Sequence, residues 1–175
     1  MNEVLKALKE RRSIRHFKKQ IPSKEEIDQI TEAGLYAPNG KGLQAVISIV
    51  IINPELIERF KVVNTQIGGY PEGTDPFYGA PVIIVVLSRK DNPNKQYDGA
   101  LVMGNMMLAA HALGLGSIWI NRARQEFEMD EFKQILKDLE IEGEWEGVGH
   151  CAIGYIDGEV PKAAPRKENR IYHID

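Results

Sequence analysis

The chain has 175 residues, of which 43% are hydrophobic and 27% are charged, so we expect one folded domain spanning residues 1–175 and exclude wholesale disorder. The single cysteine, Cys151, excludes an intrachain disulfide framework and any multi-cysteine metal or iron–sulfur site built from this chain alone. Residues 1–13 include acidic groups and contain no long apolar core, so we expect no signal peptide and a cytoplasmic location.

The net charge of −3 is unevenly distributed. Residues 1–24 hold eight basic and two acidic side chains, a charge of +6, so the remaining residues carry −9. A basic end on an acidic body favours local anion binding over general adhesion to nucleic acid.

The first elements are predicted to be helical. Val4, Leu5 and Leu8 stand at helical spacing and predict a short amphipathic helix that runs into Arg11, and residues 13–17 then alternate as an extended segment.

A second helix is predicted to begin at a capping box formed by Ser23 and Glu26, whose side chains satisfy each other's backbone donors. Residues 37–40 are predicted to end it. Its expected buried stripe consists of Ile27, Ile30, Gly34 and Leu35.

Residues 44–52 are predicted to form a strand that is apolar on both faces, as a sheet covered on both sides requires. A helix around Phe60, a loop at 68–81 long enough to form a wall or lid, and an apolar strand at 81–88 are expected to follow.

Residues 99–121 contain no charged side chain, which suggests either a membrane span or a buried helix. Glycines and polar residues interrupt the run, so we favour no membrane segment and a central helix at 98–113, buried on nearly all faces. Such burial in a small chain suggests that a second subunit supplies part of the cover. A helix at 129–139 and a strand at 148–156 complete an α+β or α/β layer structure.

Three arginines and a hydroxyl, Arg11, Arg12, Ser13 and Arg15, lie within five residues. Guanidinium groups bind phosphate oxygens in a bidentate manner, so the cluster predicts a cradle for one phosphate group. The alternative is a solvated basic surface.

The loop at 37–44 contains two glycines, which allow close backbone approach to a flat ligand, and Gln44 could hydrogen-bond to the edge of a heterocycle. An ordinary turn is the alternative. The glycine fingerprints of Rossmann and P-loop nucleotide sites are absent.

No side chain shows a clear catalytic pattern. The four histidines lack metal-ligand spacing, and the neighbours His150 and Cys151 are expected to face opposite sides of a strand. We therefore expect no metal and no catalytic side chain; a cofactor would carry any chemistry.

Five segments together resemble the nitroreductase family of FMN-dependent oxidoreductases, in a short single-domain form. They are residues 11–15, 37–44, 114–120, 154–155 and 165–167. The resemblance implies a three-layer α/β/α sandwich with an antiparallel or mixed sheet, and an intertwined homodimer that binds two FMN molecules at its interface.

The same resemblance implies roles for individual residues. Arg11, Arg12, Ser13 and Arg15, helped by Arg166 and Lys167, would hold the FMN phosphate and ribityl chain. Pro38, Asn39 and Gly40 would contact the flavin ring from the other subunit, while Trp119, Ile120 and Asn121 would lie beside the ring with a backbone N–H near flavin N5. Asn64 or Gln66 would reach its pyrimidine edge.

The implied activity is hydride transfer from NAD(P)H to flavin N5, followed by reduction of a nitroaromatic, quinone-like or related conjugated acceptor in a ping-pong mechanism. Three alternatives remain open: a specialised flavin-dependent dehydrogenase or dehalogenase, a flavin-binding protein without turnover, and a nucleic-acid-binding module. The acidic remainder of the chain argues against the last.

Overall fold

A four-stranded sheet forms the centre of the computed structural model, which describes residues 2–174. The strands lie in the order β1–β2–β4–β3, every neighbouring pair is antiparallel, and β1 and β3 are therefore the two edges. In chain order the elements are α1 (Glu3–Glu10), α2 (Lys24–Leu35), the 3₁₀ turn η1 (Gly40–Gly42), β1 (Val46–Ile51), α3 (Pro54–Ile67), β2 (Val82–Arg89), α4 (Lys95–Ala112), β3 (Gly116–Ile120), α5 (Ala123–Glu126), α6 (Asp130–Asp138) and β4 (Trp145–Gly154).

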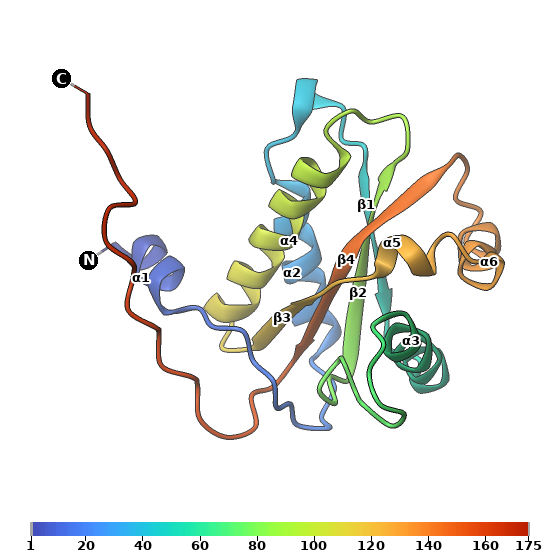
Figure 1. The fold of residues 1–175 in the computed structure, drawn as a ribbon, viewed down its shortest axis with the longest axis horizontal. Coiled ribbons are helices and arrows are strands. Elements are labelled where there is room, and N and C mark those ends of the chain that lie inside the picture. Colours follow the sequence, from blue (N-terminus) through green and yellow to red (C-terminus); the bar gives the residue numbers. More distant parts are fainter. Residues whose placement is uncertain (1, 175) are drawn as a thin grey trace.

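Helices cover both faces of this sheet (Figure 1). The helices α2 and α4 lie on one face, and α3, α5 and α6 lie on the other. Every residue of β2 from Val82 to Leu87 is fully buried, because both faces of this inner strand are covered. The predicted three-layer α+β architecture is confirmed, with an antiparallel sheet.

The start of α2 matches the predicted capping box. The Ser23 hydroxyl accepts the N–H of Glu26 at 3.2 Å, and the Glu26 carboxylate accepts the N–H of Ser23 at 2.8 Å. The hydroxyl of Tyr155, just after β4, donates to the same carboxylate at 2.8 Å. The hydrogen bond from the Ser23 backbone, followed by that from Tyr155, lowers the pKa of Glu26, and the bond to Glu26 raises the pKa of Tyr155.

Two expectations about burial are wrong for the single chain, and the burial expected for α4 is incomplete without the second subunit that the sequence suggests. Leu35, at the end of α2, is 72% exposed instead of joining the buried stripe. The edge strand β1 leaves Val50 39% exposed, although Val46 on the same face of the strand packs against the core beneath α4. The helix α4 packs on the sheet and α2 through one face only, so Tyr97 and Leu101 on its other faces are exposed.

Residues 13–17 run along the free edge of β3 and then reach the end of β4. Ser13 forms a parallel bridge with Ser117, and Phe17 forms an antiparallel bridge with Ile156. This pairing holds the basic N-terminal segment beside β3.

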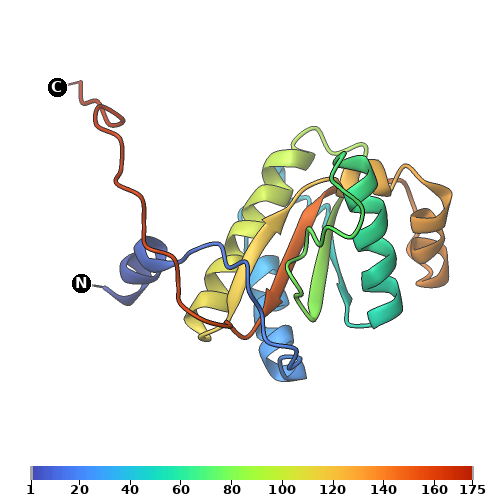
Figure 2. The same ribbon diagram turned by 60° about the horizontal axis from the view of Figure 1, so that its bottom comes forward.

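Residues 158–174 extend away from the sheet and pass beside α1 (Figures 1 and 2). Ile171, Tyr172 and Ile174 on this tail are each at least 79% exposed. Within residues 2–174, no helix has both the length and the apolar character needed to cross a membrane.

Candidate functional site

The edge strand β3 forms one wall of a cavity of about 330 Å³. Four of the predicted site residues line it together: Arg15, Trp119, Ile120 and Asn121. The opposite wall comes from the loop after α3, including Tyr70 and Tyr78, which supports the expectation that this loop forms a wall.

Two guanidinium groups lie against the aromatic rings of this β3 cavity. The Cζ atom of Arg15 lies 5.9 Å from the ring centroid of Tyr78, and that of Arg122 lies 4.8 Å from the ring centroid of Tyr70. Arg122 also donates a hydrogen bond to the Tyr70 hydroxyl. Neither arginine forms an ion pair with a carboxylate among residues 2–174. Asp75 also lines the cavity, but its carboxylate accepts the N–H groups of Phe77 and Gly79, so two arginines against one carboxylate leave a positive, aromatic cavity that suits a planar, anionic ligand.

The sequence patterns did not single out Tyr70 or Arg122. Arg122 has a left-handed backbone conformation, with a φ of 85°, which costs free energy for a residue with a side chain. The sequence gives no sign of this conformation at an arginine, because the residue that usually adopts a left-handed backbone is glycine.

Two further predicted residues, Arg11 and Arg12, have buried hydrogen-bond donors that no acceptor in the described chain satisfies. Arg12 Nη1 donates to the carbonyl oxygens of Lys9 and Arg11, but Arg12 Nε and Arg11 Nη1 are buried with no hydrogen-bond partner in the described chain. Buried donors without acceptors are unfavourable, so these atoms suit a bound anion.

The charge of Arg11 also affects the pKa of Cys151, the single cysteine of the sequence. Burial raises the pKa of the Cys151 thiol to about 12, although the nearby charge of Arg11 acts in the opposite direction. Cys151 packs on the α4 side of the sheet, whereas His150 contacts Phe60 on the α3 side, so the prediction that the two side chains face opposite sides is confirmed.

The predicted loop residues lie beside β1, at the opposite edge of the sheet from β3. The Asn39 side chain accepts the N–H of Gln44 at 2.9 Å, and the buried Asp98 carboxylate of α4 accepts the N–H of Gly40 at 3.0 Å. Pro38, Asn39, Gly40 and Gln44 are therefore not brought to the β3 cavity within one chain. Arg166 and Lys167 are not brought there either, because they are exposed on the extended tail.

Asn64 does not line the β3 cavity. It is fully buried, and its amide Nδ2 donates to the carbonyl oxygen of Asn121 at 2.9 Å and to Glu126 Oε1 at 2.8 Å. The structure therefore does not support a direct contact between Asn64 and a cofactor; its contact is with the backbone behind the cavity wall.

Asn64 belongs to a buried network with Glu126 and His150, all three of which have no exposed surface. Glu126 Oε2 lies 2.7 Å from His150 Nε2, and neither atom has another partner. A proton between the two atoms is required, because otherwise two lone pairs would face each other at this distance. Removing one partner of such a buried pair costs about 3–5 kcal/mol.

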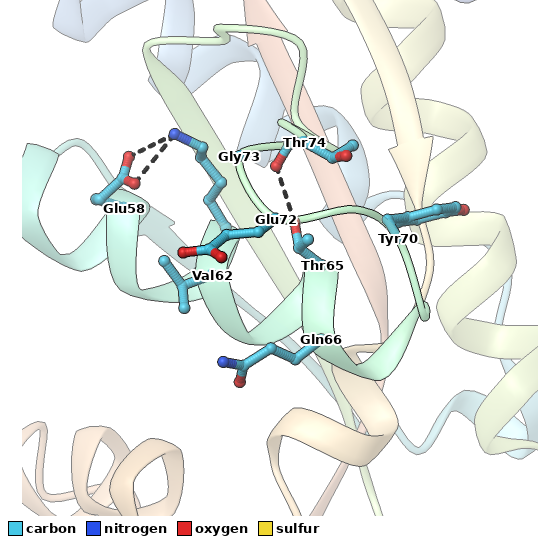
Figure 3. A pocket seen from close by; sticks show the side chains of 9 residues that line it. Glu58, Val62, Thr65, Gln66, Tyr70, Glu72, Gly73 and Thr74 are labelled. Atoms are coloured by element: carbon cyan, nitrogen blue, oxygen red, sulfur yellow. Dashed lines mark hydrogen bonds and ion pairs between the residues drawn. The ribbon is translucent and has the colours of Figure 1, made fainter.

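The helix α3 and its following loop enclose a second cavity, of about 520 Å³ (Figure 3). The Thr65 hydroxyl donates to the carbonyl oxygen of Thr74 at 2.9 Å, and Lys61 pairs with Glu58 at 2.9 Å. Because Thr74 lines both cavities, the Thr65 hydrogen bond ties the wall of the β3 cavity to α3.

The fold and these donors define a class: an α+β protein whose edge strand β3 lines a cavity with arginine and aromatic side chains. The residues that the structure describes contain no cluster of three or more His, Cys, Asp or Glu side chains that could hold a metal ion.

Comparison with known proteins identifies the family. Residues 8–155 match the model described as "Nitroreductase family", and the chain belongs to this family. A relative from Methanothermobacter thermautotrophicus, named "Putative NADH dehydrogenase/NAD(P)H nitroreductase", is 32% identical over 123 residues. That alignment covers 67% of this chain and only 60% of the relative.

Solved structures share the whole fold. Two nitroreductases with bound FMN, from Bacteroides fragilis and Desulfitobacterium hafniense, are each 28% identical to this chain, with a TM-score of 0.88 and 100% coverage of both chains. The resemblance inferred from the sequence motifs is thereby confirmed for family and fold.

Proposed function

We propose that the protein is an FMN-dependent NAD(P)H oxidoreductase that reduces nitroaromatic, quinone-like or related conjugated acceptors. The observation that carries this proposal is the β3 cavity, which Arg15, Trp119, Ile120 and Asn121 line together. The FMN bound to the two structures of 28% identity supports the choice of cofactor.

FMN suits the donors of this chain. Its phosphate would satisfy the buried guanidinium atoms of Arg11 and Arg12 that lack partners, with Ser13 beside them. Its ring would lie along Trp119 to Asn121, near the positive charge of Arg15. When bound, FMN supplies the electron-transfer chemistry, while the chain binds and orients it and contributes no acid, base or nucleophile.

A homodimer would complete the site. The predicted flavin-contacting residues lie at the two opposite edges of the sheet, so a second copy is needed to bring Pro38, Asn39 and Gly40 to the β3 cavity. Apolar side chains are available for such an interface: Val4, Leu5, Leu8, Leu35 and Leu101 are all at least 45% exposed. The exposed tail would then bring Arg166 and Lys167 to a phosphate.

NAD(P)H and the acceptor would occupy the same face of the cofactor in turn. One cavity, with one set of walls from β3 and the loop after α3, is available for both. This arrangement predicts ping-pong kinetics, in which double-reciprocal plots at several acceptor concentrations give parallel lines.

The first test is the visible absorption spectrum of the purified full chain, with FMN stoichiometry and the rate of NAD(P)H oxidation measured on a panel of acceptors. We expect one FMN per chain and acceptor-dependent oxidation. Protein that cannot be loaded with FMN would refute the proposal. FMN binding without oxidation would identify a flavin-binding protein, and release of halide or dehydrogenation of one substrate would identify a specialised enzyme.

The homodimer is tested by sedimentation of the full chain and of a variant lacking residues 161–175. We expect a dimeric full chain and weaker FMN binding in the shortened variant. A full chain that is monomeric and binds one FMN would contradict the shared site. A shortened variant that binds FMN as tightly as the full chain would contradict the role of the tail.

A further inference from the structure

The buried network beneath β3 contacts the backbone of the cavity wall at two consecutive residues. Asn64 Nδ2 donates to the carbonyl oxygen of Asn121 at 2.9 Å. His150 Nδ1 lies 3.3 Å from the carbonyl oxygen of Ile120, and because a carbonyl only accepts, Nδ1 must carry the hydrogen. Glu126 joins the two side chains through its two carboxylate oxygens.

These contacts orient two peptide groups. In a planar trans peptide, the carbonyl of one residue and the N–H of the next point in opposite directions. Since the carbonyls of Ile120 and Asn121 face the network, the N–H groups of Asn121 and Arg122 point away from it. The hydrogen bonds of residues 2–174 include none donated by either N–H, and these residues line the β3 cavity.

We propose that Asn64, Glu126 and His150 are positioning residues for the cofactor: they hold two consecutive peptide groups so that the N–H groups of Asn121 and Arg122 face the flavin ring in the β3 cavity. The inference rests on the proposed function, because it assumes that FMN occupies this cavity. It adds three buried residues from α3, α5 and β4 that would determine affinity without touching the cofactor.

The network is suited to this task because its members cannot relax independently. The rings of Phe60 and Phe77 pack against the His150 ring in T-shaped arrangements, at centroid distances of 5.6 and 5.2 Å. Glu126 is fully buried and bonded on both oxygens, so a movement of Asn64 or His150 would leave a buried polar atom without a partner.

The first experiment removes the anchor of Asn121 with Asn64→Leu, which keeps the branched shape of Asn but has no hydrogen-bonding group. The apoprotein is titrated with FMN, and its unfolding by urea is measured in parallel. We expect the FMN dissociation constant to rise about tenfold, the effect of losing one oriented hydrogen bond. The matched control is Thr31→Val, which removes the hydrogen bond from the Thr31 hydroxyl to the carbonyl oxygen of Ile27 in α2, on the other face of the sheet, and should leave FMN affinity within twofold.

The second experiment separates geometry from charge. In Glu126→Gln, the amide oxygen can accept from Asn64 and the amide N–H can donate to His150 Nε2, so we expect FMN affinity within threefold of wild type. The double variant Glu126→Leu/His150→Phe replaces both partners by apolar side chains. Proteins often keep their stability when a buried ion pair is replaced in this way. We expect it to fold but to bind FMN at least tenfold more weakly, with the visible spectrum of bound FMN shifted toward that of free FMN.

The outcomes distinguish this inference from the proposed function. Wild-type protein that binds no FMN would refute the proposed function itself. If wild type binds FMN and the double variant binds it equally well with the same spectrum, the positioning role is wrong. If Glu126→Gln loses as much affinity as the double variant, the carboxylate acts through its charge and the geometric explanation is overturned.

Discussion

Gly147 of β4 allows the short helix α5 to lie directly on the sheet. A Cβ atom at this position would overlap the carbonyl group of Ala123 and approach the backbone nitrogen of Arg124 to 2.6 Å. These neighbours are backbone atoms, which cannot rotate away as a flexible side chain can. We therefore predict that Gly147→Ala displaces α5, and with it Glu126 at the end of this helix.

The size of the effect follows from the distances. Ordinary contact begins at 3.4 Å, so α5 must move by at least 0.8 Å from the 2.6 Å position of the Arg124 nitrogen, and further to relieve the overlap with Ala123. Overpacking of this kind costs about 1–3 kcal/mol, and rigid neighbours place Gly147→Ala at the upper end of that range. A shift of this size also exceeds what the Glu126 hydrogen bonds tolerate.

Urea unfolding of the apoprotein and FMN titration together provide the assay. The control is Gly104→Ala in α4, where a Cβ atom meets nothing within 4 Å in the chain and the helix should gain about 0.5–1 kcal/mol. A Gly147→Ala protein whose free energy of unfolding is within 0.5 kcal/mol of wild type, a margin typical of a neutral surface change, would refute the reasoning.

Three further outcomes are expected. Because burial raises the pKa of Cys151 to about 12, a thiol reagent at pH 8 should label the folded protein only as fast as it unfolds, and rapid labelling before unfolding would contradict this. Tyr155→Phe should lower stability most at neutral pH. Because the pKa of Glu26 is lowered in the folded state, its pairing with Tyr155 stabilises the fold fully above pH 4.5, and this stabilisation is lost as the pH falls through the folded pKa. Because the pKa of Tyr155 is raised, the same pairing stabilises the fold fully below pH 10.0, and this stabilisation is lost as the pH rises through the folded pKa. Urea unfolding from pH 3 to 11 measures the difference, and a pH-independent difference would count against the pairing. Asp98→Ala should cost about 1.5–3 kcal/mol, because it leaves the N–H of Gly40 without its charged acceptor, and an unchanged urea midpoint would exclude that role.

Local patterns were sufficient for several features. The capping box at Ser23 and Glu26, the buried strand around Val85 and the family motifs depend on neighbours in sequence, and the structure or the family match confirms each of them. The burial predicted for α4 on nearly all faces is not reached within one chain, because its apolar faces exceed what one chain can cover.

The sequence by itself determined the longer helices and strands, the family and the residue types that suit a phosphate and a flat ring. Only the tertiary structure decided where those residues lie. Antiparallel pairing in the order β1–β2–β4–β3 places the 37–44 loop and the β3 cavity at opposite edges. It also brings Asn64 and Glu126 together across 62 positions, behind the cavity wall. Periodicity reports which face of an element is buried but not which distant element covers it, so neither arrangement could be derived from the sequence.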